Sequence, residues 1–310
     1  MVVNIDENVG RVLAKLKTLE IERNTIVIFM TDNGPGFARY NAGMRGAKGT
    51  QYQGGIRVPF FMRWPGRIAA GREIPEVVAH IDVLPTLLQA CGIDQPASLA
   101  VDGRSFLPLI GRPGGEWPDR MLCFQWHPGE VPEPYWNCAV RDHRFKLVDG
   151  RELYDLAADP GEKRDVADKD PEVVSVMRRH YERWFEQMEA AHHFAPPRIQ
   201  LGTEHENPAT LTRQDFRGPN AGWQPDNFGY WEVEVRPGRY EIKADFFPAR
   251  EAGFVRLRFS DVMLDVPIEK DATACVFPPT VLKGGQGRMD VSLLNTSRKS
   301  GARYVHVKRV

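Results

Sequence analysis

The chain has 310 residues, of which 42% are hydrophobic and 26% charged, and its 41 basic and 41 acidic residues leave no net formal charge. This length fits one large domain or two smaller ones, and the composition is ordinary for a globular protein. The balanced charge argues against a nucleic-acid partner, because such proteins normally carry a basic excess. No apolar run approaches the roughly 20 residues that span a bilayer, so no transmembrane segment is expected.

The N-terminal segment lacks the basic region and apolar stretch of a signal peptide. Residues 6–19 are predicted to form an amphipathic helix, because their apolar residues recur with the spacing of one helix face. The residues on that face are Val9, Val12, Leu13 and Leu16. The chain is therefore expected to begin inside a domain rather than at a leader sequence.

Residues 24–31 form a nearly continuous apolar and β-branched run, which predicts a parallel strand buried on both faces. The run ends at the turn sequence Asp32-Asn33-Gly34-Pro35-Gly36. A helix, a buried strand and a polar turn in this order are typical of a doubly wound α/β sheet. In such sheets ligands bind beyond the carboxyl ends of the strands.

The following residues, up to position 194, predict a loop and then a mixture of helices and strands. Residues 36–55 are rich in glycine and lack periodicity, which indicates the loop. Strands are predicted at residues 58–64, 121–126, 138–141 and 145–148. One helix is predicted from Asp82, which would cap it, to Cys91, and another is predicted to open at Asp170-Pro171. The apolar stripe of this last helix is predicted to pack in the core.

The composition changes near residue 194, which indicates a second domain. Residues 195–227 are rich in Pro, Asn, Gly and Thr and are predicted to be a linker or crossing segment. From residue 228 apolar and polar residues alternate, with turns between the runs, which predicts an antiparallel β-sandwich over residues 228–310. The predicted domains are therefore residues 1–194 and 228–310.

Two segments carry residues suited to chemistry. Asp32 and Asn33 place a carboxylate beside an amide carbonyl at the end of a strand, which offers two hard oxygens to a divalent cation. Asp-Asn-Gly is also a favoured turn sequence, so this pair alone is open to a structural interpretation. Lys48 lies in a glycine-rich loop, where its point charge could approach an anion closely or simply be solvated.

Taken together, the motifs between residues 31 and 160 resemble the second half of the catalytic domain of type I sulfatases. The resemblance rests on Thr31-Asp32-Asn33-Gly34, Arg45-Gly46-Ala47-Lys48-Gly49-Thr50, Gly54-Gly55-Ile56-Arg57-Val58-Pro59, Trp64-Pro65-Gly66, the run from His80 to Leu87, Asp102-Gly103-Arg104-Ser105 and the run from Glu152 to Pro160. The tail is similar to the appended β domain of bacterial arylsulfatase-like proteins. The resemblance implies a partial alkaline-phosphatase-like α/β fold followed by the β-sandwich.

The resemblance also implies a site. Asp32 and Asn33 would be two ligands of a calcium ion, and Lys48 would contact an oxygen of the sulfate and the leaving-group oxygen. The family's nucleophile is a formylglycine made from Cys or Ser in a C/S-x-P/A-x-R motif. No cysteine of this chain has Arg four positions on, and no serine begins the motif. We therefore expect a fragment with an incomplete Ca²⁺ site and no formylglycine, inactive by itself, from a periplasmic or secreted bacterial parent.

Three further predictions concern single residues. Arg45 could contact an acidic substrate or brace the loop, and His127, after an apolar strand, could face a substrate pocket or be structural. His80 is expected to serve the start of a helix rather than catalysis. Four widely spaced cysteines are expected to be buried thiols rather than disulfides.

The function expected from these observations is part of a sulfuric ester hydrolase that acts on an aryl or carbohydrate sulfate, with a sulfated small molecule or glycan as its partner. Two alternatives stay open. One is a non-catalytic recognition or assembly module, and the other is a phosphonate or phosphate monoester hydrolase of the same superfamily.

Overall fold

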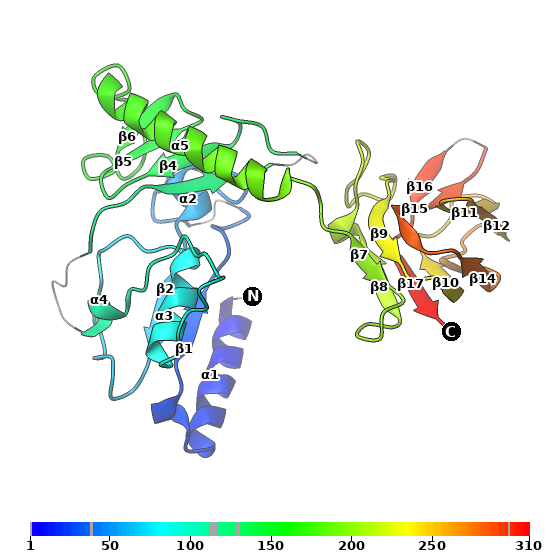
Figure 1. Cartoon of the computed structure of the whole chain (residues 1–310), viewed down its shortest axis with the longest axis horizontal. Coiled ribbons are helices and arrows are strands. Elements are labelled where there is room, and N and C mark those ends of the chain that lie inside the picture. Colours follow the sequence, from blue (N-terminus) through cyan, green and yellow to red (C-terminus); the bar gives the residue numbers. More distant parts are fainter. Residues whose placement is uncertain (1, 38–39, 112–116, 128–130, 297) are drawn as a thin grey trace. The chain divides into compact units, whose positions relative to one another are not determined.

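The computed structural model describes residues 2–37, 40–111, 117–127, 131–296 and 298–310. They form two units, of which the first ends at residue 191 and the second consists mainly of residues 192–310 (Figure 1). This division lies close to the change of composition near residue 194.

The first unit is mixed α and β. Its helices are α1 Val2–Thr18, α2 Gln53–Ile56, α3 Val83–Ala90, α4 Leu107–Gly111 and α5 Pro171–His192, with short 3-10 helices η1 Glu22–Asn24 and η2 His80–Asp82. Its strands are β1 Val27–Met30, β2 Phe60–Arg63, β3 Leu122–Gln125, β4 Cys138–Arg141, β5 Phe145–Val148 and β6 Glu152–Asp155. The elements predicted from periodicity are present, and their bounds differ by a few residues.

The strand β1 differs from its prediction. It pairs with β2, and the pairing is antiparallel, with Phe29 opposite Phe61. None of the four β1 residues is buried, and Phe61 is 66% exposed. The expected parallel strand buried on both faces is therefore wrong for the described residues. The sequence of β1 is apolar enough for a central strand, but only one neighbouring strand hydrogen-bonds to it in this part of the chain.

Strands β3 to β6 form a four-stranded antiparallel sheet in chain order, and α5 runs along it (Figure 1). The helix presents Met177, Tyr181 and Phe185, which are all buried, as the predicted apolar stripe requires. The Tyr181 hydroxyl donates to Oε1 of Gln125 over 2.7 Å, which ties the helix to β3. The prediction that this stripe packs in the core is confirmed.

The second unit is a two-sheet β-sandwich. One sheet has the order β13-β10-β17-β8 with β14 added to β10, and the other has the order β12-β11-β15-β9-β7 with β16 added to β15. The strands are β7 Ile199–Leu201, β8 Ala209–Thr212, β9 Trp231–Val235, β10 Gly238–Asp245, β11 Gly253–Phe259, β12 Val262–Ile268, β13 Ala274–Val276, β14 Thr280–Leu282, β15 Gly285–Leu294, β16 Lys299–Gly301 and β17 Tyr304–Arg309. Alternate side chains of both sheets meet in one apolar core.

Residues 195–227 are part of this sandwich rather than a linker. Within them β7 pairs with β9, β8 pairs with β17, and residues 213–215 form the 3-10 helix η3. The composition misleads because the turns are held by a single buried side chain. The Arg213 guanidinium donates to the carbonyl oxygens of Gly222, Gly301 and Ala302 at 2.8 to 3.1 Å.

Candidate functional site

The turn that follows β1 and the glycine-rich loop around Lys48 are packed against each other. The Lys48 N–H donates to the carbonyl of Pro35 over 3.0 Å, and the Gly34 N–H donates to the carbonyl of Gly55 over 2.9 Å. A β-carbon on Gly34 would lie 1.8 Å from the carbonyl oxygen of Gly54, so a side chain does not fit there. The two predicted segments therefore meet, and this contact fixes Lys48 relative to Asp32.

The meeting point is polar and open to solvent. Asp32 and Lys48 are both exposed, and Asn33 is partly exposed. A hydrogen bond from the Asn33 side chain lowers the pKa of Asp32, and the backbone N–H of Asn33 and the positive charge of Lys48 lower it further, against the opposing effect of burial. Asp32 is thus held as a carboxylate beside an ammonium group.

His80 lies at the same end of β1. Its Nε2 is 2.8 Å from the carbonyl oxygen of Thr31, so the ring can donate to the residue that precedes Asp32. The nearby Asp82 does not cap α3 with its side chain. Its buried carboxylate instead accepts the N–H groups of Ala79 and Arg104 at 2.7 and 2.8 Å and pairs with Arg120.

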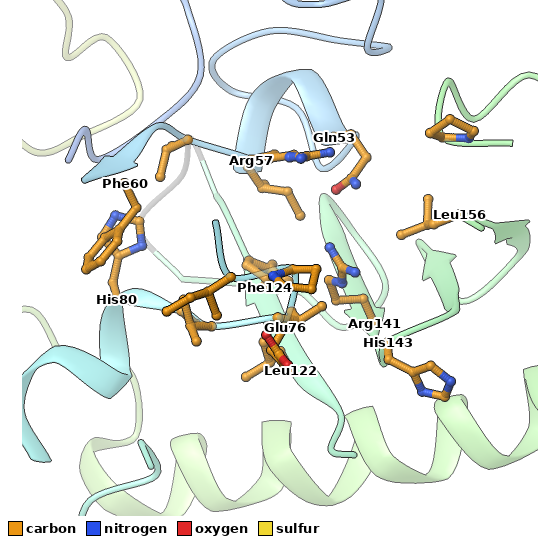
Figure 2. A pocket seen from close by; sticks show the side chains of 18 of the residues that line it. Gln53, Arg57, Phe60, Glu76, His80, Leu122, Phe124, Arg141, His143 and Leu156 are labelled. Atoms are coloured by element: carbon orange, nitrogen blue, oxygen red, sulfur yellow. The ribbon is translucent and has the colours of Figure 1, made fainter. Parts of the chain in front are cut away.

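A cavity of about 520 Å³ adjoins α2 and β4 (Figure 2). Its lining includes Gln53 and Arg57 from the end of the Lys48 loop and α2, and Arg141 from β4. His80 also lines it, whereas Asp32 and Lys48 do not. The cavity is thus lined by elements next to the Lys48 loop and not by Lys48 itself.

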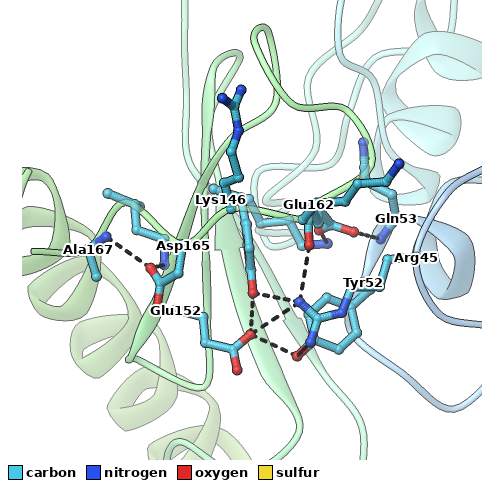
Figure 3. Close-up of polar contacts among 12 residues, drawn as sticks. Arg45, Tyr52, Gln53, Lys146, Glu152, Glu162, Asp165 and Ala167 are labelled. Carbon is cyan, nitrogen blue, oxygen red and sulfur yellow. Dashed lines mark hydrogen bonds and ion pairs between the residues drawn. The ribbon is translucent and has the colours of Figure 1, made fainter. Parts of the chain in front are cut away.

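Arg45 braces the Lys48 loop (Figure 3). Its guanidinium donates to the hydroxyls of Tyr154 and Tyr52 at 2.6 and 2.9 Å and to the carbonyl of Glu162 at 3.1 Å. It also lies 3.6 Å from the Glu152 carboxylate and over the Tyr52 ring. Burial and the hydrogen bond to Glu152 raise the pKa of Tyr52 to about 12, so the phenol stays a neutral donor. These contacts favour the bracing role of Arg45 over substrate binding.

A buried ion pair anchors the other end of the loop. Lys146 Nζ lies 2.6 Å from Oε1 of Glu162, and neither side chain is exposed. Oε2 of Glu162 accepts the backbone N–H of Gln53 over 2.7 Å. Burial lowers the pKa of Lys146 to about 8, against the attraction of Glu162. Nothing in the sequence pattern marked this pair, because its members lie on a strand and in a turn with no periodic relation.

His127 is partly buried at the end of β3, and no described contact assigns it a partner. Its neighbour Trp126 is the residue that approaches the Lys48 loop: a β-carbon on Gly49 would lie 4.0 Å from Cζ2 of Trp126. The Trp126 side chain is 44% exposed. The sequence predicted a substrate contact for His127, whereas the side chain that lies near the Lys48 loop is that of Trp126.

The oxygen donors of Asp32 and Asn33 fit a hard cation such as Ca²⁺, which takes about six to eight oxygens. Two residues supply only part of that set. One other described group, Asp119, Asp142 and His143, brings potential ligand atoms within 4.8 Å of one another. It is separate from Asp32 and is accounted for by its own hydrogen bonds, including His143 Nδ1 to Asp119 at 2.6 Å.

The four cysteines are free thiols, as expected, but only Cys138 and Cys275 are buried, whereas Cys123 is partly exposed and Cys91 exposed. Burial raises the pKa of Cys123 to about 12 and those of Cys138 and Cys275 to about 11. These three thiols therefore stay protonated at neutral pH and are poor nucleophiles.

Comparison with known proteins shows which family the first unit resembles. Residues 1–93 match the profile of the Sulfatase family. Steryl-sulfatase of Mus musculus is 38% identical over 206 residues, which cover 53% of this chain and 32% of that protein. Arylsulfatase A of Homo sapiens is 30% identical over 237 residues, covering 65% of this chain and 46% of that protein. The chain thus spans less than half the length of these relatives.

A solved structure gives the same result for the fold. The crystal structure of Ps i-CgsB in complex with k-i-k-neocarrahexaose matches with a TM-score of 0.54 and 26% identity, over 59% of this chain and 41% of that chain. The expected partial alkaline-phosphatase-like fold with an additional β region is confirmed. The helices that the structure describes are too short or too polar to span a bilayer. Residues 1–93 and these relatives thus make the first unit similar to the type I sulfatases.

Proposed function

We propose that this chain carries part of the active site of a calcium-dependent sulfuric ester hydrolase that cleaves aryl or carbohydrate sulfates. The observation that carries the proposal is the packing of the Lys48 loop against the Asp32-Asn33 turn, with Gly34 and Lys48 both hydrogen-bonded across the contact. The match of residues 1–93 to the Sulfatase family model supports a sulfate ester as the substrate class. Because the chain spans less than half the length of these relatives, the complete hydrolytic activity is itself part of the proposal.

Each residue has a distinct task in this mechanism. Asp32 and Asn33 would hold Ca²⁺ together with ligands from elsewhere, and the bound ion would polarise the sulfate ester. The Lys48 ammonium is a compact point charge, suited to stabilise negative charge as it moves onto the ester oxygen. Its position depends on Arg45, whose four polar partners fix the start of the loop.

Trp126 is the residue that would meet the organic part of the substrate. Its half-exposed ring lies beside Gly49, next to Lys48, and a flat aromatic face suits an aryl or sugar ring. The names of the relatives, steryl-sulfatase and arylsulfatase A, support an aryl or related ester, and the oligosaccharide in the Ps i-CgsB structure supports a carbohydrate.

The chain supplies no nucleophile for the reaction. The formylglycine motif does not occur in the sequence, and Cys123, Cys138 and Cys275 are held as protonated thiols. We therefore expect binding without turnover, even after treatment with a formylglycine-generating enzyme, since positioning alone leaves little catalysis without a nucleophile.

The test is titration calorimetry of the full chain with 4-nitrocatechol sulfate in the presence of Ca²⁺. Lys48→Ala should weaken binding by about tenfold or more, the value of one charge-assisted contact. The matched Lys163→Ala, at an exposed lysine, should leave binding unchanged. An unaltered affinity in Lys48→Ala would remove the support for this site.

Two further measurements distinguish the alternatives. Tighter binding of 4-nitrophenyl phosphate than of the sulfate would favour the phosphatase alternative. Calcium itself should bind weakly, because Asp32 and Asn33 supply few of the ligands that it needs. Micromolar affinity for Ca²⁺ that disappears in Asp32→Ala would contradict an incomplete metal site.

A further inference from the structure

Two arginines line the cavity that adjoins α2 and β4. Arg57 follows α2 and Arg141 ends β4, and both line the cavity. Figure 2 shows the Arg141 side chain directed toward the Gln53 amide, with the Arg57 guanidinium on the other side of that amide. Burial and the positive charge of Arg57 lower the pKa of Arg141, which shows that two like charges act on each other here.

These two charges are poorly compensated by the protein. Arg141 Nε donates to the backbone carbonyl of Asp142 over 3.1 Å, and no described ion pair involves the guanidinium of either Arg57 or Arg141. Glu76 also lines the cavity, but it is a single carboxylate against two guanidinium groups. The two carboxylates that act on Arg141 also have other partners: Asp142 accepts the backbone N–H groups of Arg144 and Phe145, and Glu162 pairs with Lys146.

Gln53 supplies an unsatisfied polar group at the same place. The residue is 4% exposed, its Oε1 is buried without a hydrogen-bond partner, and Figure 2 shows the amide at the cavity. A buried amide oxygen without a partner costs about 1–3 kcal/mol, so no hydrogen bond to Oε1 holds the amide in its present orientation. A half-turn of the amide would bring Nε2 into the cavity as a third donor beside the two guanidinium groups.

We propose that this cavity binds a small oxyanion, a sulfate or a carboxylate group, held by Arg57 and Arg141 with the amide of Gln53. Guanidinium groups match the planar geometry of such oxyanions and can each donate two hydrogen bonds. The site goes beyond the proposed sulfatase function, because neither Asp32, Asn33 nor Lys48 lines the cavity.

The test is titration calorimetry of the full chain with sodium sulfate at constant ionic strength, set with sodium chloride. Arg57→Gln should weaken sulfate binding by about tenfold or more, because one charge-assisted pair is lost. Gln53→Met, which keeps the side-chain length and removes its polar atoms, should also weaken it. Arg151→Gln, at an exposed arginine outside the cavity, should have no effect.

Lys48→Ala separates this site from the proposed active site. Sulfate binding that survives in Lys48→Ala and weakens in Arg57→Gln supports the cavity. Binding that is lost in Lys48→Ala and unchanged in Arg57→Gln and Gln53→Met would overturn the proposal, as would a sulfate response equal to that of chloride. Circular dichroism of each variant checks that it is folded.

A parallel titration with sodium acetate identifies the source of the oxyanion. Acetate binding that is tighter than sulfate binding and sensitive to Arg57→Gln points to a carboxylate, such as an acidic side chain. Sulfate binding that is tighter points to a free tetrahedral anion. Binding of neither anion would overturn the proposal.

Discussion

At the residue scale, Glu162 connects the Lys48 loop to the sheet of the first unit. Lys146→Met would leave the Glu162 carboxylate buried without its partner, and we expect a loss of about 3–5 kcal/mol in the free energy of unfolding. Lys146→Met combined with Glu162→Gln removes both charges and keeps an acceptor for the Gln53 N–H, so it should cost less. Urea denaturation of the two variants measures the difference.

Lys163→Met is the matched control for this experiment, because Lys163 is exposed and one position from Glu162. It should change the free energy of unfolding by less than about 0.5 kcal/mol. If the single Lys146→Met variant were no less stable than the double variant, the buried charge of Glu162 would not be the cause.

A second prediction at this scale concerns how the contribution of Asp155 to stability depends on pH. Its hydrogen bond from Arg144 lowers the pKa of Asp155, and the N–H groups of Ala157 and Ala158 act in the same direction. A carboxyl group whose pKa is lower in the folded than in the unfolded chain stabilises the fold at pH values above the unfolded pKa of 3.8. This stabilisation is lost as the pH falls through the lower pKa of the folded state. Asp155→Asn should therefore be less stable than the wild type at pH 7.

The difference in unfolding midpoint between Asp155→Asn and the wild type should shrink as the pH falls below about 4, where the aspartate becomes protonated. Urea denaturation between pH 7 and pH 3 follows this change. A difference that stays constant over the whole range would show that the charge of Asp155 is not what stabilises the turn.

At the scale of elements, the site depends on close approach between a turn and a loop. Gly34→Ala would place a β-carbon 1.8 Å from the carbonyl oxygen of Gly54 and force the two segments apart. We expect a loss of about 1–3 kcal/mol in stability, as for other overpacked positions, together with weaker binding of 4-nitrocatechol sulfate.

Gly36→Ala is the matched control, because a β-carbon there has no atom within 4 Å and the residue does not have a positive φ. It lies two positions from Gly34 in the same turn and should keep both stability and binding. Equal effects of the two substitutions would show that the turn is sensitive to any side chain and not to this contact.

At the scale of the whole molecule, the two units differ in how well they cover their apolar residues. The second unit has its own core, which includes Trp231, Tyr240 and Leu257, all fully buried. The first unit leaves the β1–β2 pair partly uncovered, and α1 has no buried residue. Exposed apolar strands are prone to association and to local opening.

We therefore expect limited proteolysis of the full chain to degrade residues 1–190 first and to leave a stable fragment near the second unit. The fragment should begin close to residue 195, because β7 and β8 belong to the sandwich. A fragment starting at about residue 225 would lack both strands and would contradict this assignment. Mass spectrometry of the resistant fragment identifies its ends.

The sequence by itself predicted most of the regular segments and the family that the first unit resembles, although it missed β7 and β8. The helical spacing of Met177, Tyr181 and Phe185 predicted the buried face of α5, and strict alternation predicted β9. Asp32, Asn33 and Lys48 were chosen as candidate site residues from motif order alone. These features are local or collinear, so they depend on residues that are close together in the chain.

The tertiary structure decided which residues meet. Arg45 donates to Tyr154, 109 positions further along the chain, and Trp126 rather than His127 approaches Gly49. Strand β1 has the composition of a central strand, yet its described neighbour is antiparallel and its residues are partly exposed. Such outcomes depend on long-range packing, and the periodicity of a single segment carries no information about its distant partners.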